Sequence, residues 1–167
     1  QAKLTNQKYR AIGLGTFGWH HLLALKQLKW ENDEAVKYAD ELYEKISYLT
    51  IKASLELAKE KGSYPVFKGS DWETGAYFDK KGYRSDNSSL DWDSLKSEIS
   101  KHGIRNGYLM AVAPNASTSI LAGSTASIDP IFQKVYSEEK KDYKIPVTVP
   151  DLNPTTTWFY KSAYLID

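Results

Sequence analysis

The chain has 167 residues, enough for one domain with a sizeable core, and 41% of them are hydrophobic and 26% charged, as in ordinary globular proteins. Lys and Arg total 22 against 21 Asp and Glu, so the net charge of +1 gives no electrostatic reason to expect nucleic acid or an anionic membrane as a partner. The absence of cysteine excludes disulfides, cysteine-ligated metals and thiol chemistry within this chain, and it fits a cytoplasmic protein.

The first third of the chain is predicted to be mostly helical. Residues 1–10 are polar and predict an extended lead-in, and residues 16–27 suit a helix whose start follows closely spaced glycines. Apolar residues at three- and four-residue spacing over 34–61 predict a long amphipathic helix. Gly62 supplies its C-terminal stop, because glycine readily adopts the left-handed backbone that follows a helix.

The middle of the chain is predicted to hold loops, two further helices and one buried strand. Residues 63–89 predict an irregular surface segment with a short helix over 71–75. Asp91 is placed to cap a helix over 92–102, which a glycine ends. The uninterrupted apolar run 108–113 is typical of a strand buried on both faces, as in a parallel sheet covered by helices.

The last third is predicted to contain a short helix over 118–122 and a β-hairpin. Segments 131–137 and 143–149 form the two arms, and charged residues form the tip. Two prolines and a run of threonines then predict the start of a final helix. With no internal repeat and no convincing boundary, we predict a single segment over 1–167. Its fold class is α/β, helix-rich, with a few mostly parallel strands and the hairpin.

The turn between the predicted strand and the short helix has the chemistry of a phosphate site. Asn115, Ala116, Ser117 and Thr118 are small or polar, so an anion can approach the unpaired N–H groups and the positive dipole at a helix start. The alternative is plain capping, in which Asn115 or Ser117 only satisfies the helix end. The local sequence alone favours capping, and both interpretations stay open at this point.

Two other patterns give weaker evidence for a binding site. Gly13, Gly15 and Gly18 have the G-x-G-x-x-G spacing of a dinucleotide site, but no hydrophobic strand precedes them, so close packing of the backbone is the better interpretation. His20 and His21 are adjacent and lack the i, i+4 spacing of a helical metal site, which favours packing or surface placement. No metal-binding residues and no catalytic nucleophile are predicted in this chain.

Several stretches of the chain, which follow one another in the order expected, resemble a known family. The segment 105–119 (RNGYLMAVAPNASTS) resembles part of the large, catalytic subunit of class I ribonucleotide reductases. Further matching stretches lie on both sides of it, at 10–15 (RAIGLG), 53–62 (ASLELAKEKG), 127–130 (SIDP) and 160–167 (YKSAYLID). Together they cover nearly the whole chain and are far more specific than any one motif.

The resemblance implies a fold and an activity. The family's catalytic subunit is a ten-stranded α/β barrel, and this chain resembles a segment from its second half. The family reduces ribonucleoside diphosphates to the 2′-deoxy forms for DNA synthesis by cysteine-radical chemistry. Its strand-to-helix turn of this type holds the substrate diphosphate, so Asn115, Ala116, Ser117 and Thr118 are identified as the substrate-phosphate residues.

The departures from the family pattern limit what this chain does. The radical-bearing cysteine and the redox cysteine pair have no counterpart here, so the isolated chain is expected to be inactive. The expected partners are the rest of the large subunit, the radical-generating small subunit with its metal or radical cofactor, and nucleotide effectors. No cofactor is expected on this chain itself. The alternative is a non-catalytic α/β module that binds a phosphorylated ligand or a partner protein.

Overall fold

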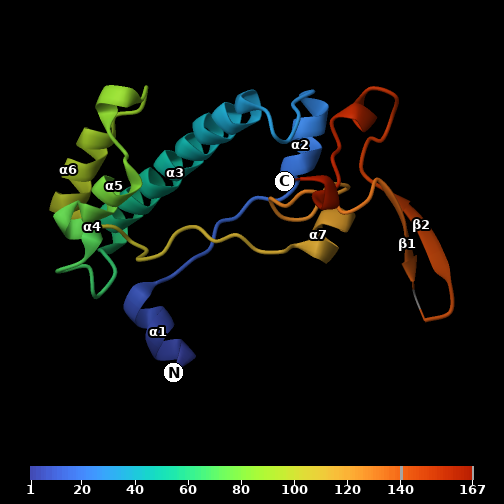
Figure 1. Ribbon diagram of the computed structural model, residues 1–167. Helices are drawn as coiled ribbons and strands as arrows, with labels where there is room; N and C mark the ends of the chain where they lie inside the picture. The colour runs from blue at the N-terminus through green and yellow to red at the C-terminus, as the bar shows by residue number, and fades with distance from the viewer. Residues whose placement is uncertain (140, 167) are drawn as a thin grey trace. The chain divides into compact units, whose positions relative to one another are not determined.

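The computed structural model describes residues 1–139 and 141–166, and their contacts divide into two units. Unit 1 consists of Gln1–Leu14 and Glu41–Ala111, and unit 2 of Gly15–Asp40 and Val112–Asp167. Figure 1 labels the helices and strands along the chain. Within the described residues, no helix combines the length and apolar character that crossing a membrane requires.

The longest element is α3 (Asp33–Lys61), which confirms the helix predicted from apolar spacing. Acidic residues lie in its first turn and Lys59 and Lys61 in its last, where each sign of charge is favourable to the helix dipole. Its apolar stripe is buried at Ile51 and Leu55, which are 1% and 2% exposed.

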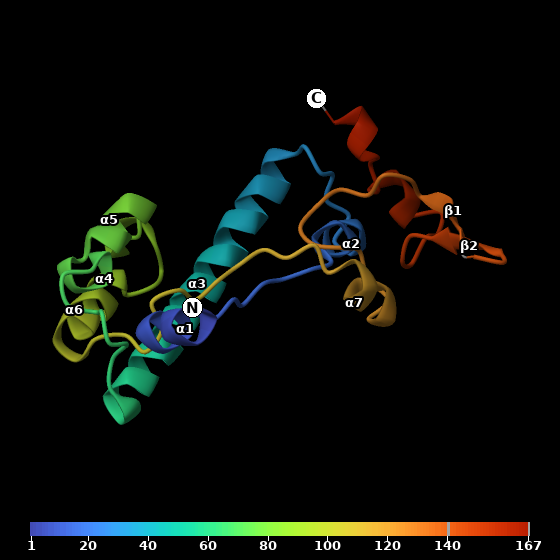
Figure 2. The same cartoon turned by 90° about the horizontal axis from the view of Figure 1, so that it is seen from below.

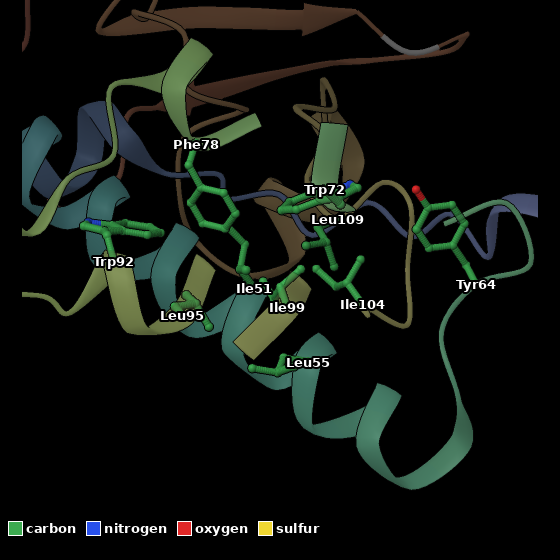
Figure 3. Packing of buried hydrophobic residues seen from close by; sticks show 10 residues of the cluster. All are labelled: Ile51, Leu55, Tyr64, Trp72, Phe78, Trp92, Leu95, Ile99, Ile104 and Leu109. Carbon is green, nitrogen blue, oxygen red and sulfur yellow. The ribbon is translucent and has the colours of Figure 1, made fainter. Parts of the chain in front are cut away.

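Three short helices cover the C-terminal half of α3 in unit 1 (Figure 1, Figure 2). Their aromatic side chains form the core with the α3 stripe, and Phe78 and Trp92 are almost fully buried (Figure 3). Tyr83 stacks on Trp92 with ring centroids 4.1 Å apart. The elements are α4 (Asp71–Thr74), α5 (Ala76–Lys81), the 3-10 turn η1 (Ser85–Asn87) and α6 (Trp92–His102).

The helices predicted over 71–75 and 92–102 are confirmed, but the prediction of an irregular surface segment over 63–89 is wrong, because Tyr64, Trp72 and Phe78 in it are buried in the core. The side chain of Asp91 accepts a hydrogen bond from the N–H of Ser94 at 3.0 Å, so it caps α6 as expected. The helix predicted over 71–75 is α4. Helix α5 was not predicted, because it begins directly after Gly75 in a stretch whose composition is typical of a loop.

The prediction of an extended lead-in over 1–10 is wrong, because α1 (Ala2–Tyr9) forms there. None of its residues is buried, so the segment lacks the apolar periodicity that signals a helix in a sequence. The next helix, α2 (Trp19–Leu25), is shorter than the predicted 16–27. It begins after Gly18, whose left-handed backbone (φ 82°) cannot belong to the helix.

The apolar run 108–113 does not form the predicted doubly buried strand. The N–H of Leu14 donates to the carbonyl of Leu109 at 2.8 Å, and Leu14 makes a single parallel bridge with Met110. Tyr108 and Val112 are 63% and 64% exposed. The segment therefore has the composition of a strand, but within the described residues it pairs only with the short stretch that contains Leu14.

Unit 2 contains the predicted hairpin, in which β1 pairs antiparallel with β2 and Tyr136 lies opposite Val147. Lys140 in the charged tip lies outside the described residues, as does Asp167. Among the described residues this hairpin is the only sheet, so a set of mostly parallel strands stays a prediction. Besides α2 and the start of α3, unit 2 contains one helix, two strands and two 3-10 turns. They are α7 (Ala116–Leu121), β1 (Val135–Glu139), β2 (Lys144–Thr148), η2 (Thr156–Trp158) and η3 (Ala163–Leu165).

The predicted final helix is wrong, since the described C-terminal residues form only η2 and η3. The side-chain oxygen of Asn153 accepts from the N–H groups of Thr155 and Thr156 at 2.8 and 3.0 Å, and Ser162 accepts from the N–H of Tyr164 at 3.3 Å. Such side-chain bonds to nearby backbone compete with a continuous helix. The chain therefore turns twice instead of continuing in one direction.

Two substitutions on α3 test the packing of unit 1. Leu55→Ala should lower the free energy of unfolding by about 2–5 kcal/mol, because it removes a buried side chain and leaves a cavity. Leu49→Ala makes the same change on the same helix at a position 64% exposed, and it should change stability by less than about 1 kcal/mol. Urea unfolding measures both, and equal losses would contradict the assigned core.

Candidate functional site

The predicted phosphate turn lies at the start of α7. Asn115 is the residue before the helix and has a left-handed backbone (φ 47°), and its carbonyl accepts from the N–H of Ser119 at 2.9 Å. Within the described chain no side-chain hydrogen bond caps this end of α7. Ser117 and Thr118 are exposed. The first N–H groups of a helix have no partner within it, and here they belong to exposed residues, two of which carry hydroxyls.

The other end of α7 is closed by backbone hydrogen bonds. The N–H of Ser124 donates to the carbonyl of Ser119 at 2.9 Å, and the N–H of Gly123 donates to Ile120 at 3.1 Å. Gly123 has φ 62°, so the two bonds form the glycine-ended motif common at helix C-termini. The buried hydroxyl of Ser119 donates to the carbonyl of Ala116 at 2.8 Å. The backbone of Ser124 is thus hydrogen-bonded to the short helix that carries the turn.

A cavity of about 720 Å³ adjoins the turn within unit 2. Pro114, Ala116 and Ser119 form part of its wall, and the rest comes from the remainder of α7, the segment between α7 and β1, the two hairpin strands and the residues that follow β2. Its volume lies in the range of pockets that hold small molecules. A ligand held at the turn would therefore have room beside α7.

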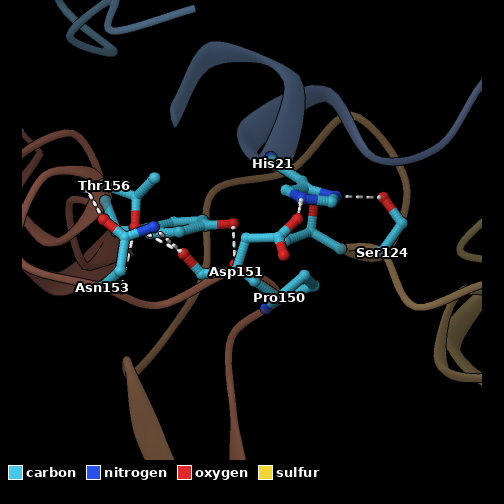
Figure 4. Close-up of polar contacts among 8 residues, drawn as sticks. His21, Ser124, Pro150, Asp151, Asn153 and Thr156 are labelled. Atoms are coloured by element: carbon cyan, nitrogen blue, oxygen red, sulfur yellow. Dashed lines mark hydrogen bonds and ion pairs between the residues drawn. The ribbon is translucent and has the colours of Figure 1, made fainter. Parts of the chain in front are cut away.

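One histidine joins α2 to two distant parts of unit 2 (Figure 4). His21 Nδ1 lies 3.1 Å from the hydroxyl oxygen of Ser124, and His21 Nε2 lies 2.8 Å from a carboxylate oxygen of Asp151. Because the carboxylate only accepts, Nε2 carries a proton, and in the neutral ring Nδ1 accepts from the Ser124 hydroxyl. The His21 side chain is 13% exposed and the Asp151 side chain 62% exposed, so the ring is shielded from water while the carboxylate faces solvent.

Two further contacts bring α2 against the segment after α7. The backbone N–H of His21 donates to the hydroxyl oxygen of Thr125 at 3.2 Å. A Cβ atom on Gly18 would lie 2.3 Å from the hydroxyl oxygen of Ser124, so only glycine fits there. Gly13 similarly lies close to Ala111, with 3.0 Å from its added Cβ to that side chain. The glycines thus allow close approach, as the sequence analysis inferred.

The Ser124–His21–Asp151 group is not arranged as a hydrolase triad. In such triads the nucleophile contacts Nε2 and the acid contacts Nδ1, whereas here the two contacts are reversed. No local motif predicts the group, because Ser124 and Asp151 lie 103 and 130 residues from the histidine. Its chemistry suits holding segments together rather than bond cleavage.

The neighbouring His20 is fully buried in unit 2. Its Nδ1 accepts from the N–H of Ile131 at 3.0 Å, so the proton of the neutral ring is on Nε2, which donates to the carbonyl of Phe159 at 3.3 Å. Burial lowers the pKa of His20 to about 4; the Phe159 carbonyl opposes this shift and the charge of Lys134 adds to it. His20 therefore packs as a neutral, hydrogen-bonded side chain, as the packing interpretation expected. Among the described residues no cluster of three His, Cys, Asp or Glu side chains could hold a metal ion.

Comparison with known proteins identifies the family. The family model described as the ribonucleotide reductase barrel domain matches residues 1–162. The chain belongs to this family. The resemblance stated from ordered motifs is thereby confirmed.

Similar curated proteins carry the name ribonucleoside-diphosphate reductase subunit alpha. The one from Treponema pallidum is 50% identical over 166 residues, covering 99% of this chain and 19% of that protein. The one from Helicobacter pylori is 44% identical, covering all of this chain and 22% of that protein. The one from Bacillus subtilis is 32% identical, covering 97% and 26%. The chain thus spans about a fifth to a quarter of the length of these relatives.

The buried His20 gives unit 2 a defined response to acid. Because its folded pKa of about 4 lies below the ordinary 6.5, the neutral ring contributes stability that is complete above about pH 6.5 and is lost as the pH falls toward 4. The loss should reach roughly 3 kcal/mol at 1.36 kcal/mol per pKa unit. Titration of the ring resonances by NMR should show His20 still neutral at pH 5.

A His20→Gln variant serves as the control for this measurement. It assigns the His20 resonance by its disappearance, and urea unfolding of the variant should show a smaller decrease in stability between pH 6.5 and 4. A His20 resonance that titrates near pH 6.5 would contradict the buried, neutral assignment.

Proposed function

We propose that this chain is a segment of the catalytic α subunit of a ribonucleoside-diphosphate reductase and supplies its substrate-diphosphate turn. The observation that carries the proposal is the family match over residues 1–162, which includes the outward-facing helix start at Asn115, Ala116, Ser117 and Thr118. The complete subunit would convert ribonucleoside diphosphates to 2′-deoxyribonucleoside diphosphates by radical chemistry. This segment would hold the substrate.

The geometry of the turn suits a diphosphate. Backbone N–H groups and the positive end of the α7 dipole favour an anion, and the Ser117 and Thr118 hydroxyls add donors. Asn115 has the left-handed backbone that ends the preceding segment sharply, and its side chain does not cap α7 within the described chain. The donors are therefore left for a ligand, which supports phosphate binding over plain capping.

The exposed apolar run supports a place in a larger barrel. Tyr108, Met110 and Val112 are 63%, 41% and 64% exposed, yet the segment already makes a parallel bridge with Leu14. Unpaired parallel strands with apolar side chains normally have neighbours on both edges and helices on both faces. We propose that strands from the rest of the subunit complete a ten-stranded α/β barrel around it.

The chemistry itself would come from other parts of the enzyme. This chain has no cysteine, so thiol-radical and disulfide steps need residues that lie elsewhere in the subunit. A radical-generating small subunit with a metal or radical cofactor, and nucleotide effectors, would complete the system. A cytoplasmic location stays a prediction.

The turn is tested in the complete reductase subunit together with its radical-generating partner. A Ser117→Ala/Thr118→Ala variant should raise KM for ribonucleoside diphosphates about 10- to 100-fold, because two hydrogen bonds to a charged phosphate are lost. Steady-state kinetics and direct binding of the diphosphate give the two measurements.

The matched control removes the same two residue types from other exposed positions, Thr5 and Ser137. A Thr5→Ala/Ser137→Ala variant should keep KM within about twofold. If the Ser117→Ala/Thr118→Ala variant binds diphosphate as tightly as this control, the turn is not the phosphate site.

The chain by itself should be catalytically silent. Without cysteine it holds no thiol to carry the radical or to supply electrons from a dithiol. Incubation of the purified chain with the small subunit, a dithiol reductant and a ribonucleoside diphosphate should form no deoxy product by chromatography. Product formed at a rate that depends on this chain's concentration would overturn the assignment.

A further inference from the structure

We infer that His21 is a positioning residue for the Asn115–Thr118 turn, acting through Ser124 at the far end of α7. The inference rests on the proposed function of that turn. His21 does not contact the turn itself, and its side chain instead joins Ser124 to Asp151. The geometry makes it the link between a short helix and a fixed point elsewhere in unit 2.

A continuous path of hydrogen bonds leads from the turn to the imidazole ring. The carbonyl of Asn115 accepts from the N–H of Ser119, and the carbonyl of Ser119 accepts from the N–H of Ser124, both at 2.9 Å. The hydroxyl of Ser124 then meets Nδ1 of His21 at 3.1 Å. The contact between His21 and Ser124 is therefore connected through backbone hydrogen bonds to both ends of α7.

Asp151, which contacts Nε2 of His21, is held in place through its backbone. The carbonyl of Asp151 accepts from the Thr156 hydroxyl at 2.6 Å and from the Asn153 amide at 2.9 Å (Figure 4). The Tyr160 hydroxyl donates to the Pro150 carbonyl at 2.8 Å. Burial, together with the nearby Asp151 charge, raises the pKa of Tyr160, so this donor keeps its proton. The ring is thus held against a defined turn.

A short helix needs such support. α7 has six residues, and isolated helices of that length are not stable in water. Its N–H groups can hold a diphosphate only while the helix stays formed and correctly placed. Gly18 allows the Ser124 hydroxyl to approach α2, and Thr125 accepts from the N–H of His21, so the same segment is held twice.

Two substitutions of His21 separate its two contacts. The amide of asparagine reaches the place of Nδ1 and can keep the Ser124 contact, whereas the amide of glutamine reaches the place of Nε2 and can keep only Asp151. In the complete subunit with its partner, His21→Gln should raise KM for ribonucleoside diphosphates about five- to tenfold, with kcat within about twofold. His21→Asn should raise KM less than His21→Gln, because it can keep the Ser124 contact that leads to α7.

Two further variants give the inference independent support. Ser124→Ala should match His21→Gln, and the double variant should be no worse than either single one, because both remove the same contact. Asp151→Asn keeps an acceptor for Nε2 and should change KM less than either. A His21→Asn variant as impaired as His21→Gln, or an unchanged KM in His21→Gln, would overturn the inference.

Failure of the inference can be told apart from failure of the proposed function. If Ser117→Ala/Thr118→Ala weakens diphosphate binding while His21→Gln and Ser124→Ala leave it unchanged, the turn binds phosphate but His21 does not position it. If neither set changes binding, the phosphate assignment fails as well. Binding of inorganic pyrophosphate to the same proteins tests the turn without the nucleoside.

Discussion

The first turn of α2 is the point on which the arrangement of unit 2 depends. Two adjacent histidines there contact segments that are far apart in the chain. His20 receives the N–H of Ile131 and reaches the carbonyl of Phe159, and His21 joins Ser124 to Asp151. These contacts connect the end of α7 and both sides of the hairpin to one short helix, so specific polar bonds add to apolar burial in holding unit 2 together.

The two histidines show how burial separates the roles of identical side chains. His20 is fully buried, and its Nδ1 faces a backbone N–H, so a second proton would lose that bond and carry a charge without water. His21 faces a hydroxyl, which can donate or accept, and a partly exposed carboxylate. Both partners can therefore accept a hydrogen bond from the His21 ring, and the Ser124 hydroxyl can also donate one.

Local sequence patterns predicted the elements whose signals are local. The apolar stripe of α3, the Asp91 cap of α6 and the hairpin with its charged tip were all predicted, because each depends on residues within a few positions. The polar α1 has no buried residue and so gives no such signal. The contacts of His21 span more than 100 residues, and only the folded chain reveals them.

If the Asn115–Thr118 turn holds the diphosphate as proposed, its affinity depends on residues distant from the ligand. Its main donors would be backbone N–H groups, which nearly every residue carries, so side-chain identity at the turn sets only part of the affinity. What the sequence has to specify is the placement of those donors. That placement comes from the left-handed Asn115, from the glycine that ends α7, and from the link of Ser124 to His21. Selection for substrate binding would therefore act on a helix start and on its distant support together.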